Sequence, residues 1–205
     1  MSRVALADAY RKIESLVQSG CSVAEGMAQV IEHCARERPH PDWARLRAQE
    51  WEAESSQLKH WLTHVLRTEP PPATITGWWF GLFNPVRDGE PSTDLYVAGN
   101  PYDAEDGDWP CGPRWFPEGR YAHSKVLADI HALAYAGTNP ESGLGNDAEY
   151  PLCLAYAALS VRTLAQRLDS KLLLGEAKER FLVVGFDSGD SMVIGRLCAD
   201  GLRPA

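Results

Sequence analysis

The first third of the chain has apolar residues at helical spacing. One such series ends at Gly20, and its members share one face of a predicted helix: Leu6, Tyr10, Ile13 and Val17. Ser22 and Glu25 form the pattern of a capping box, which predicts the start of a second helix. Its apolar face continues to Cys34, and Pro39 and Pro41 then interrupt the pattern.

A long third helix is predicted from Asp42, expected as its N-cap, to Val65. Its inward stripe contains two glutamates: Trp43, Leu46, Glu50, Trp51, Glu54, Leu58, Trp61, Leu62 and Val65. Three successive prolines in "TEPPPAT" end the helix and form a stiff hinge. They divide an N-terminal helical region, residues 1–69, from a sheet domain, residues 70–205. We expect the two to form one continuous compact unit.

The pattern changes to that of strands in "ITGWWFGLF" (75–83) and "DLYVAG" (94–99), which a turn-rich loop joins. Successive side chains of a strand point to opposite faces, so Trp78 and Trp79 face opposite ways. Both faces are apolar, and we therefore expect both to be covered. Trp79 should lie over Gly77, Gly81 or a glycine of a neighbouring strand, because glycine leaves room for an indole ring.

The rest of the chain predicts two helices and a hairpin. The helices cover residues 120–137, ending at Gly137, and residues 150–168, with Pro151 in the first turn. The second helix is apolar nearly all round, which is typical of a buried helix. "FLVVGFDSGDSMVIGRL" predicts a hairpin in which Phe186 faces Ser191, Val184 faces Val193 and Leu182 faces Gly195. The fold class is α+β, with an antiparallel sheet of about four strands covered by helices.

Net charge bears on the class of binding partner, and cysteine content bears on the cellular compartment. The chain has 28 acidic and 20 basic residues and a net charge of −8, which argues against nucleic acid and permits a basic protein partner. Five cysteines without a paired spacing indicate reduced thiols and a cytoplasmic protein. We find no signal peptide and no membrane span, so we expect no membrane association.

Several patterns suggest chemistry but have simpler explanations. His60 and His64 have metal-chelating spacing, yet both should face solvent. Asp187 and Asp190 flank a turn that favours Asp for backbone reasons. Cys111 lies in a loop, and the sequence shows no base beside it that would activate it as a nucleophile.

"GLGND" (143–147) precedes a helix. We expect Asn146 or Asp147 to cap that helix, and we do not expect the segment to bind phosphate. We predict no catalytic residue, metal site or cofactor.

The segment "NPYDAEDGDWPCGPRWFPEG" (100–119) is long, acidic and aromatic, and loops of that length are often functional. Carboxylates complement basic groups, and aromatic rings supply contact area. We predict a partner-binding site that comprises Asp103, Glu105, Asp106, Asp108 and Trp109.

The stretches "WWFGLF", "DLYVAG", "YDAEDGDW" and "RYAHSKVL", with the late hairpin, resemble bacterial immunity proteins of polymorphic toxin systems. The resemblance covers roughly the last two thirds of the chain. It implies a small acidic binding protein that neutralises one basic toxin domain by occlusion, as in a toxin–antitoxin pair. Two alternatives stay open: an enzyme or small-ligand protein with a tryptophan-lined pocket, and a structural module that self-associates through its N-terminal helices. The oligomeric state stays open.

Overall fold

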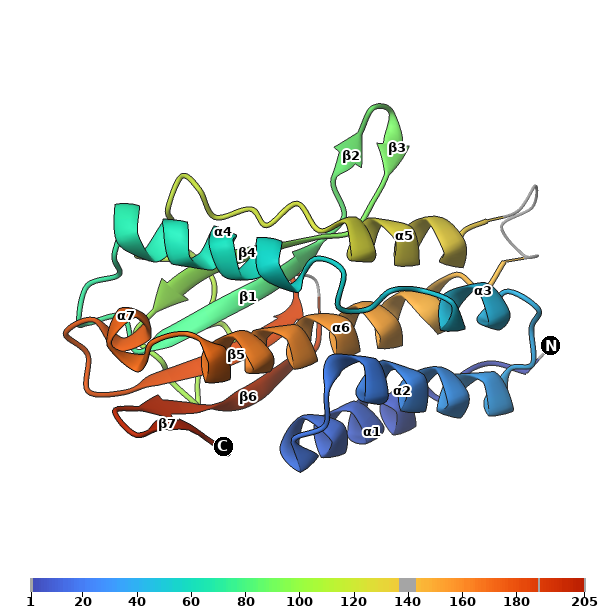
Figure 1. The fold of residues 1–205 in the computed structure, drawn as a ribbon, viewed down its shortest axis with the longest axis horizontal. Helices are drawn as coiled ribbons and strands as arrows, with labels where there is room; N and C mark the ends of the chain where they lie inside the picture. The colour runs from blue at the N-terminus through green and yellow to red at the C-terminus, as the bar shows by residue number, and fades with distance from the viewer. Residues whose placement is uncertain (1, 137–142, 188, 205) are drawn as a thin grey trace.

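The computed structural model describes residues 2–136, 143–187 and 189–204 (Figure 1). Its helices are α1 (Leu6–Ser19), α2 (Val23–Glu37), α3 (Trp43–Arg47), α4 (Ser55–Thr68), α5 (Lys125–Ala134), α6 (Asn146–Arg167) and α7 (Ser170–Leu174). Its strands are β1 (Gly77–Phe83), β2 (Val86–Arg87), β3 (Glu90–Pro91), β4 (Asp94–Asn100), β5 (Arg180–Phe186), β6 (Ser191–Cys198) and β7 (Gly201–Arg203). The predicted α+β class is confirmed.

The sheet is mixed, and the prediction of an antiparallel sheet of about four strands was wrong. Its five strands have the order β4-β1-β5-β6-β7, and β1 pairs with β5 in parallel while the other pairs are antiparallel. Parallel strands need a crossover connection, and here helices α5, α6 and α7 lie between β4 and β5 in the chain. A separate two-stranded hairpin, β2–β3, occupies part of the predicted loop between the first two strands.

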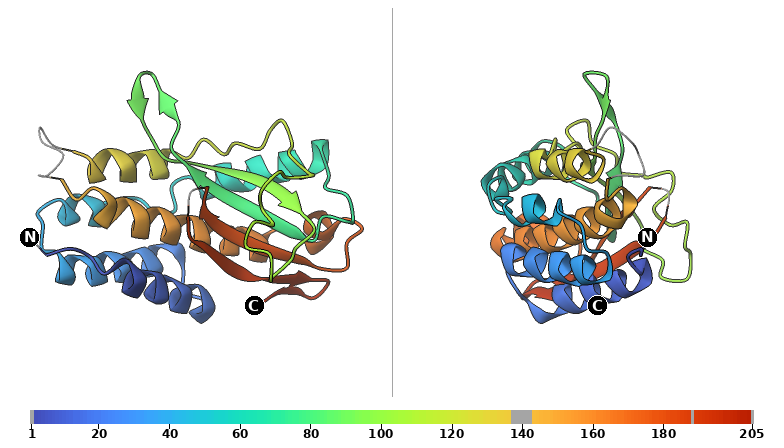
Figure 2. Two further views of the ribbon diagram at one scale, coloured as in Figure 1. Left: turned by 180° about the vertical axis from the view of Figure 1, so that it is seen from behind. Right: turned by 90° about the vertical axis from the view of Figure 1, so that its right-hand side faces the viewer.

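The helices lie on one side of the sheet, and α6 is the helix on which the others pack. It contacts β1, β5 and β6 of the sheet and also α1, α2, α4 and α5 (Figure 1). Every residue from Leu152 to Val161 is buried, as predicted for a helix that is apolar nearly all round. One cluster contains the buried apolar residues of 1–69 and those of 70–205, except Trp79, Ala98 and Val183 on the opposite face of the sheet. We call the sheet face under α6 the helix face and the opposite face the loop face (Figure 2).

The predicted third helix is two helices. Helix α3 ends at Arg47, α4 begins at Ser55, and Asp42 precedes α3 without a side-chain capping bond. In the intervening turns Glu50 is exposed, whereas Glu54 is buried. The Glu54 carboxylate accepts hydrogen bonds from the Ser124 hydroxyl and, at 2.8 Å, from Tyr156. A continuous helix would place both glutamates on the apolar stripe, and the break separates them.

The two adjacent tryptophans face opposite ways, as predicted. Trp78 is fully buried on the helix face, whereas Trp79 lies on the loop face and is 5% exposed. Trp79 packs over two glycines, which confirms the expectation. A Cβ atom on Gly81 would lie 2.6 Å from Trp79 Nε1, and one on Gly185 would overlap the far edge of the same indole.

Three finer predictions have mixed outcomes. The capping box of Ser22 and Glu25 is present. In the hairpin Leu182 faces Gly195 as expected, but a β-bulge beyond this pair makes Val184 face Met192. The same shift places Ser191 opposite Gly185 instead of Phe186.

The ends of the predicted helices also differ. Helix α6 begins earlier than predicted, so Pro151 lies in its second turn. Gly145, rather than Asn146 or Asp147, occupies its N-cap position. The predicted helix end at Gly137 falls outside the described residues.

A buried arginine joins the linker before β1 to the segment before β5. Arg180 is 0% exposed, and among the described residues its guanidinium contacts no carboxylate. It donates to the carbonyl oxygens of Ile75, of Pro71 at 3.2 Å and of Leu174 at 2.9 Å. It also lies 5.4 Å from the ring centre of Trp78. Burial lowers the pKa of Arg180 to about 10.

We expect Arg180→Met to lower the free energy of unfolding by about 3 kcal/mol, because three buried carbonyl groups lose a charged donor. Urea denaturation measures this change. Arg36→Met, at an exposed site on α2, is the matched control and should change the value by less than about 0.5 kcal/mol. Equal effects of the two substitutions would contradict the role of Arg180.

We expect Gly185→Ala to destabilise the protein by about 2 kcal/mol. The added methyl group would overlap the Trp79 ring and lie 2.7 Å from the Asp190 carbonyl oxygen, a backbone atom with little freedom to move. Gly107→Ala is the matched control, because a Cβ atom there meets nothing within 4 Å. Urea denaturation of both variants, with tryptophan fluorescence as the signal, tests the pair. A tolerated Gly185→Ala would show that Trp79 can shift.

Candidate functional site

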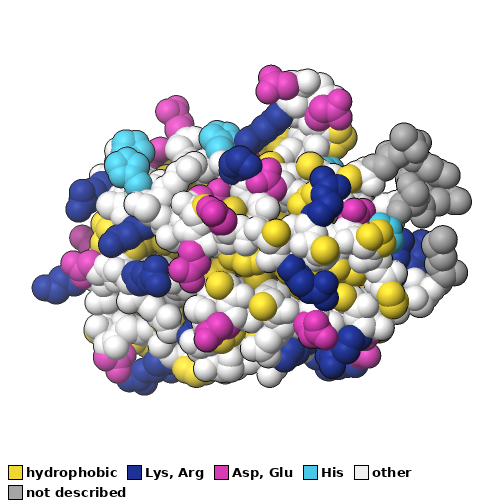
Figure 3. All heavy atoms as spheres, turned by 45° about the vertical axis from the view of Figure 1, so that its right-hand side comes forward, with side chains coloured by type: hydrophobic (Ala, Val, Ile, Leu, Met, Phe, Trp, Pro, Cys, Tyr) yellow, Lys and Arg dark blue, Asp and Glu magenta, His cyan; other side chains and the backbone are white. Residues whose placement is uncertain are grey.

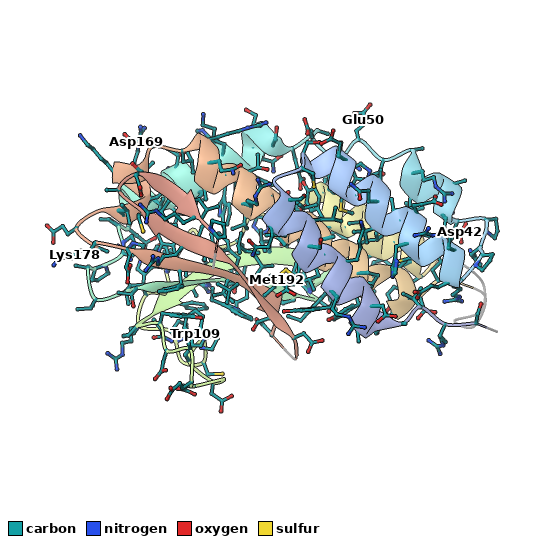
Figure 4. The ribbon with its side chains drawn as sticks, turned by 90° about the horizontal axis from the view of Figure 1, so that it is seen from below. Asp42, Glu50, Trp109, Asp169, Lys178 and Met192 are labelled. Atoms are coloured by element: carbon teal, nitrogen blue, oxygen red, sulfur yellow. The ribbon has the colours of Figure 1, made fainter. Side chains whose placement is uncertain are left out.

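The acidic loop, residues 101–110, crosses the loop face of the sheet (Figure 2). Tyr102 stacks on Phe181 of β5, with ring centres 4.1 Å apart. Trp109 packs edge-on against Tyr102 at 5.2 Å and against Trp79 at 6.4 Å. It lies on the side of the sheet opposite α1 and α2 (Figure 4). Gly77 makes this approach possible, because a Cβ atom there would lie 2.7 Å from the Trp109 ring.

Hydrogen bonds fix the backbone of the acidic loop at both ends. At its start, the Tyr102 amide donates to the Thr76 hydroxyl at 2.9 Å. At its end, the side chain of Asn100 donates to the Trp109 carbonyl at 2.7 Å and accepts from the Arg114 amide at 3.0 Å. The loop therefore has a defined conformation although it contains neither helix nor strand.

The four predicted carboxylates, Asp103, Glu105, Asp106 and Asp108, are exposed together on this loop. Asp103 accepts from the Glu105 amide at 3.0 Å, and Asp106 accepts from the Asp108 amide at 2.9 Å. Within the described part of the chain, no lysine, arginine or histidine forms an ion pair with any of the four. The structure thus brings the predicted residues together, with Trp109 as the anchor and the carboxylates toward solvent.

An aromatic strip, Phe83, Tyr96, Phe116 and Tyr121, continues the loop face beyond the acidic loop. Its rings contact one another at 5.4 Å (Phe83 and Tyr121) and 6.2 Å (Tyr96 and Phe116). The Arg120 guanidinium lies 3.9 Å from the centre of the Phe116 ring, which belongs to a residue that is 48% exposed. Sequence reasoning missed this strip, because only the pairing of β1 with β4 and the return of residues 115–121 along β4 assemble it.

A polar cluster surrounds the buried carboxylate of Glu149 near the start of α6. Its Oε1 atom accepts from Asn84 Nδ2 at 2.7 Å and from Thr93 Oγ1 at 3.1 Å, and it lies 3.2 Å from His131 Nδ1. Its Oε2 atom accepts from the Tyr135 hydroxyl at 2.6 Å. Burial raises the pKa of Glu149, but hydrogen bonds from His131, Tyr135 and Asn84 outweigh burial and lower the pKa to about 2. Local sequence carries no signal for this cluster, because its members come from four separate segments.

A second buried carboxylate, Asp94, anchors the β2–β3 hairpin to the start of α5. It is 0% exposed and accepts from the Ser124 amide at 2.9 Å. Arg87 contacts it from the hairpin, and His123 Nδ1 lies 3.1 Å away. The backbone of His123 has φ of +52°, in the left-handed region that residues other than glycine adopt infrequently. These contacts hold the two segments together.

The other residues that the sequence suggested for metal binding or catalysis are either exposed or hydrogen-bonded to a tyrosine. His60 and His64 are exposed, as expected, and so is Cys111. Asp187 accepts a hydrogen bond from Tyr96 at 2.7 Å, and Asp190 accepts one from Tyr150 at 2.6 Å. In the described ranges, no three His, Cys, Asp or Glu side chains lie close enough together to hold a metal ion.

One alternative hypothesis was a small-ligand pocket lined by tryptophans. On the helix face of the sheet, the tryptophan of β1 is packed against protein. Trp78 is fully buried and stacks on Trp115 at 5.8 Å. A cavity of about 240 Å³ lies instead among α2, α4 and α6, with Trp51 and Tyr156 in its wall. Among the described helices, none has the length and apolar character needed to span a bilayer.

We expect the Glu149 cluster to make stability depend on pH. Its pKa is lowered from the ordinary 4.5 to about 2, so its contribution is present above pH 4.5 and is lost as the pH falls toward 2. Glu149→Gln should lower the free energy of unfolding by about 3 kcal/mol at neutral pH, and the difference should shrink below pH 4.5. Urea denaturation over this pH range tests it. The exposed Glu176→Gln is the matched control, and a pH-independent difference for Glu149→Gln would contradict the expectation.

The fold and these sites were compared with known proteins in three ways. No protein-family model, no curated protein and no solved structure matches this chain. The functional argument therefore depends on the geometry of the chain itself.

Proposed function

We propose that this chain is a binding protein that holds a basic protein domain against the loop face of its sheet. The observation that carries the proposal is the display of four carboxylates that form no ion pair with any described residue, on a loop whose conformation is already fixed. A partner that supplies lysine or arginine side chains would complete the ion pairs that the described residues leave unformed.

The charge of the acidic loop differs from that of the side of the molecule shown in Figure 3. Residues 101–110 contain four acidic residues and no lysine or arginine. On the side of the molecule shown in Figure 3, acidic and basic side chains are interspersed. A concentrated negative charge accelerates encounter with a positive partner and weakens as salt increases.

The fixed conformation of the loop supports binding because little conformational entropy remains to be lost. Tyr102 and Trp109 anchor the loop on the sheet, and Asn100 holds its two ends together. The adjacent aromatic strip offers apolar contact area, to which the exposed ring of Phe116 contributes most directly. Aromatic residues are enriched at protein-binding surfaces, and the carboxylates add complementarity to a basic partner.

The resemblance to immunity proteins gives the proposal its most specific form. In that form the partner is a toxin domain with a basic surface, and the chain neutralises it by covering that surface. Occlusion requires no catalytic group in this chain.

The test replaces the four loop carboxylates with isosteric amides: Asp103→Asn, Glu105→Gln, Asp106→Asn and Asp108→Asn. A basic protein retained from a lysate by the wild-type chain should be lost with this variant. Calorimetry with the purified partner should show an affinity loss of about tenfold or more, and the wild-type affinity should fall with added salt.

A matched control makes the same change in net charge elsewhere, at four exposed glutamates: Glu14→Gln, Glu50→Gln, Glu52→Gln and Glu176→Gln. This control should bind as the wild type does. Equal losses in both variants would show an effect of net charge alone, and unchanged affinity in the loop variant would remove the acidic loop from the mechanism.

A further inference from the structure

A cavity of about 320 Å³ opens on the helix side of the molecule, away from the acidic loop. It lies between the start of α1, the start of α6 and the β5–β6 hairpin, and its wall comprises Leu6, Asn84, Asn146, Glu149, Tyr150, Phe186, Gly189 and Asp190. A second cavity of about 310 Å³ adjoins it and shares Leu6, Tyr150 and Asp190. No lysine or arginine is among these lining residues of the first cavity.

Most hydrogen-bond donors around this cavity are already engaged inside the protein. The Tyr150 hydroxyl donates to Asp190 Oδ2 at 2.6 Å, and the Tyr135 hydroxyl donates to Glu149 Oε2 at 2.6 Å. The Asn84 amide nitrogen contacts Glu149 Oε1 at 2.7 Å and the Thr93 hydroxyl at 3.0 Å. Asn146, an exposed lining residue, is the one whose amide nitrogen donates to no described residue.

Acceptor capacity, in contrast, remains open. Glu149 is 8% exposed, and among the described residues its Oε2 atom accepts a single hydrogen bond, from the Tyr135 hydroxyl, although a carboxylate oxygen can accept two. Among the described residues no donor reaches Asp190 Oδ1 or Asn84 Oδ1. Three residues that line one cavity, from three segments, thus each have an oxygen atom with acceptor capacity that the described residues do not fill, and two of the three are carboxylates.

An aromatic pair forms the apolar part of the wall. Tyr150 of α6 stacks on Phe186 of β5, with ring centres 5.5 Å apart and planes within 15°. Leu6 extends this surface from α1. Aromatic faces attract cations and pack well against short alkyl chains.

We propose that this cavity binds a small organic ammonium ion, with its N–H groups directed to the open oxygens of Glu149, Asp190 and Asn84. An ammonium group has three donors and no acceptor, which matches a site whose donors are largely engaged and whose acceptors are open. Its positive charge is complementary to the two carboxylates, and its alkyl chain packs on Tyr150 and Phe186. A neutral alcohol lacks the charge, and an anion meets both carboxylates.

The site lies on the other side of the sheet from the acidic loop. Asp187 and Asp190 belong to the same hairpin, yet Asp187 bonds to Tyr96 on the loop face whereas Asp190 bonds to Tyr150 on the helix face. The same Asp→Asn substitution can therefore be made at Asp190, beside the cavity, and at Asp187, on the opposite face of the sheet, as a matched control.

The experiment is an NMR-detected titration of the full chain with three probes: n-butylammonium, tetramethylammonium and 1-butanol. Butylammonium should shift the amide signals of residues around Glu149 and Asp190. Tetramethylammonium, which has the charge but no N–H group, and butanol, which has no charge, should each bind about tenfold more weakly. Equal binding of tetramethylammonium would overturn the role of the acceptors, equal binding of butanol would overturn the role of charge, and no shift with butylammonium would overturn the site.

Variants locate the binding. Asp190→Asn should weaken butylammonium binding about tenfold, while the matched Asp187→Asn should leave it unchanged. Phe186→Leu removes the stacked ring without touching a carboxylate, and it should also weaken binding, which provides a second test if Asp190→Asn alters the hairpin. Wild-type affinity in both Asp190→Asn and Phe186→Leu would place any binding elsewhere.

Discussion

The sheet depends on one buried cation. Arg180 stands at the first position of β5 and donates to carbonyl groups before β1 and at the end of α7. A buried charge without a carboxylate partner is tolerated only where several hydrogen bonds replace its hydration. The geometry of that site fixes where β1 and β5 begin relative to each other, and the parallel pairing of Gly77 with Phe181 follows one residue later. The other strands pair outward from this central pair, β4 beside β1 and β6 and β7 beyond β5.

Close packing on the loop face follows from that alignment. Parallel pairing sets Gly81 beside Gly185, which leaves a flat area for the indole of Trp79. Trp109 then packs on Trp79, and Gly77 gives it room. The conformation of the acidic loop is therefore a consequence of glycine positions in two strands that are distant in the sequence.

The sequence predicted the features that depend on local pattern. The alternation around Trp78 and Trp79, the Ser22–Glu25 capping box and the buried α6 helix all follow from spacing within one segment. It could not predict the direction of β5, because hydrophobic alternation is the same in parallel and antiparallel pairs. Nor could it show that Glu54 accepts hydrogen bonds from the Lys125 and Val126 amides at the start of α5, because these partners are distant in the sequence.

The candidate sites show the same division. The four loop carboxylates are close in sequence and could be named from it. That none of them forms an ion pair within the described ranges could be seen only in the structure. The cluster around Glu149 takes its members from the end of β1, the start of β4, α5 and α6, so no short motif contains it. Asn84 is the clearest example of what the sequence could not predict. In the sequence it only follows a strand, whereas in the fold its side chain lines a cavity.

The parallel pair of β1 and β5 also has a consequence for the order in which this chain folds. Gly77 meets Phe181 only after about a hundred intervening residues have been made, and contacts of such sequence separation form slowly. The β1–β4 pair and the α1–α2 pair are closer in sequence and can form first. During synthesis on the ribosome, β1 therefore waits with one hydrogen-bonding edge open and with Trp78 and Trp79 uncovered. Such an edge invites pairing with other chains, and the speed with which α6 and β5 arrive determines how long that hazard lasts.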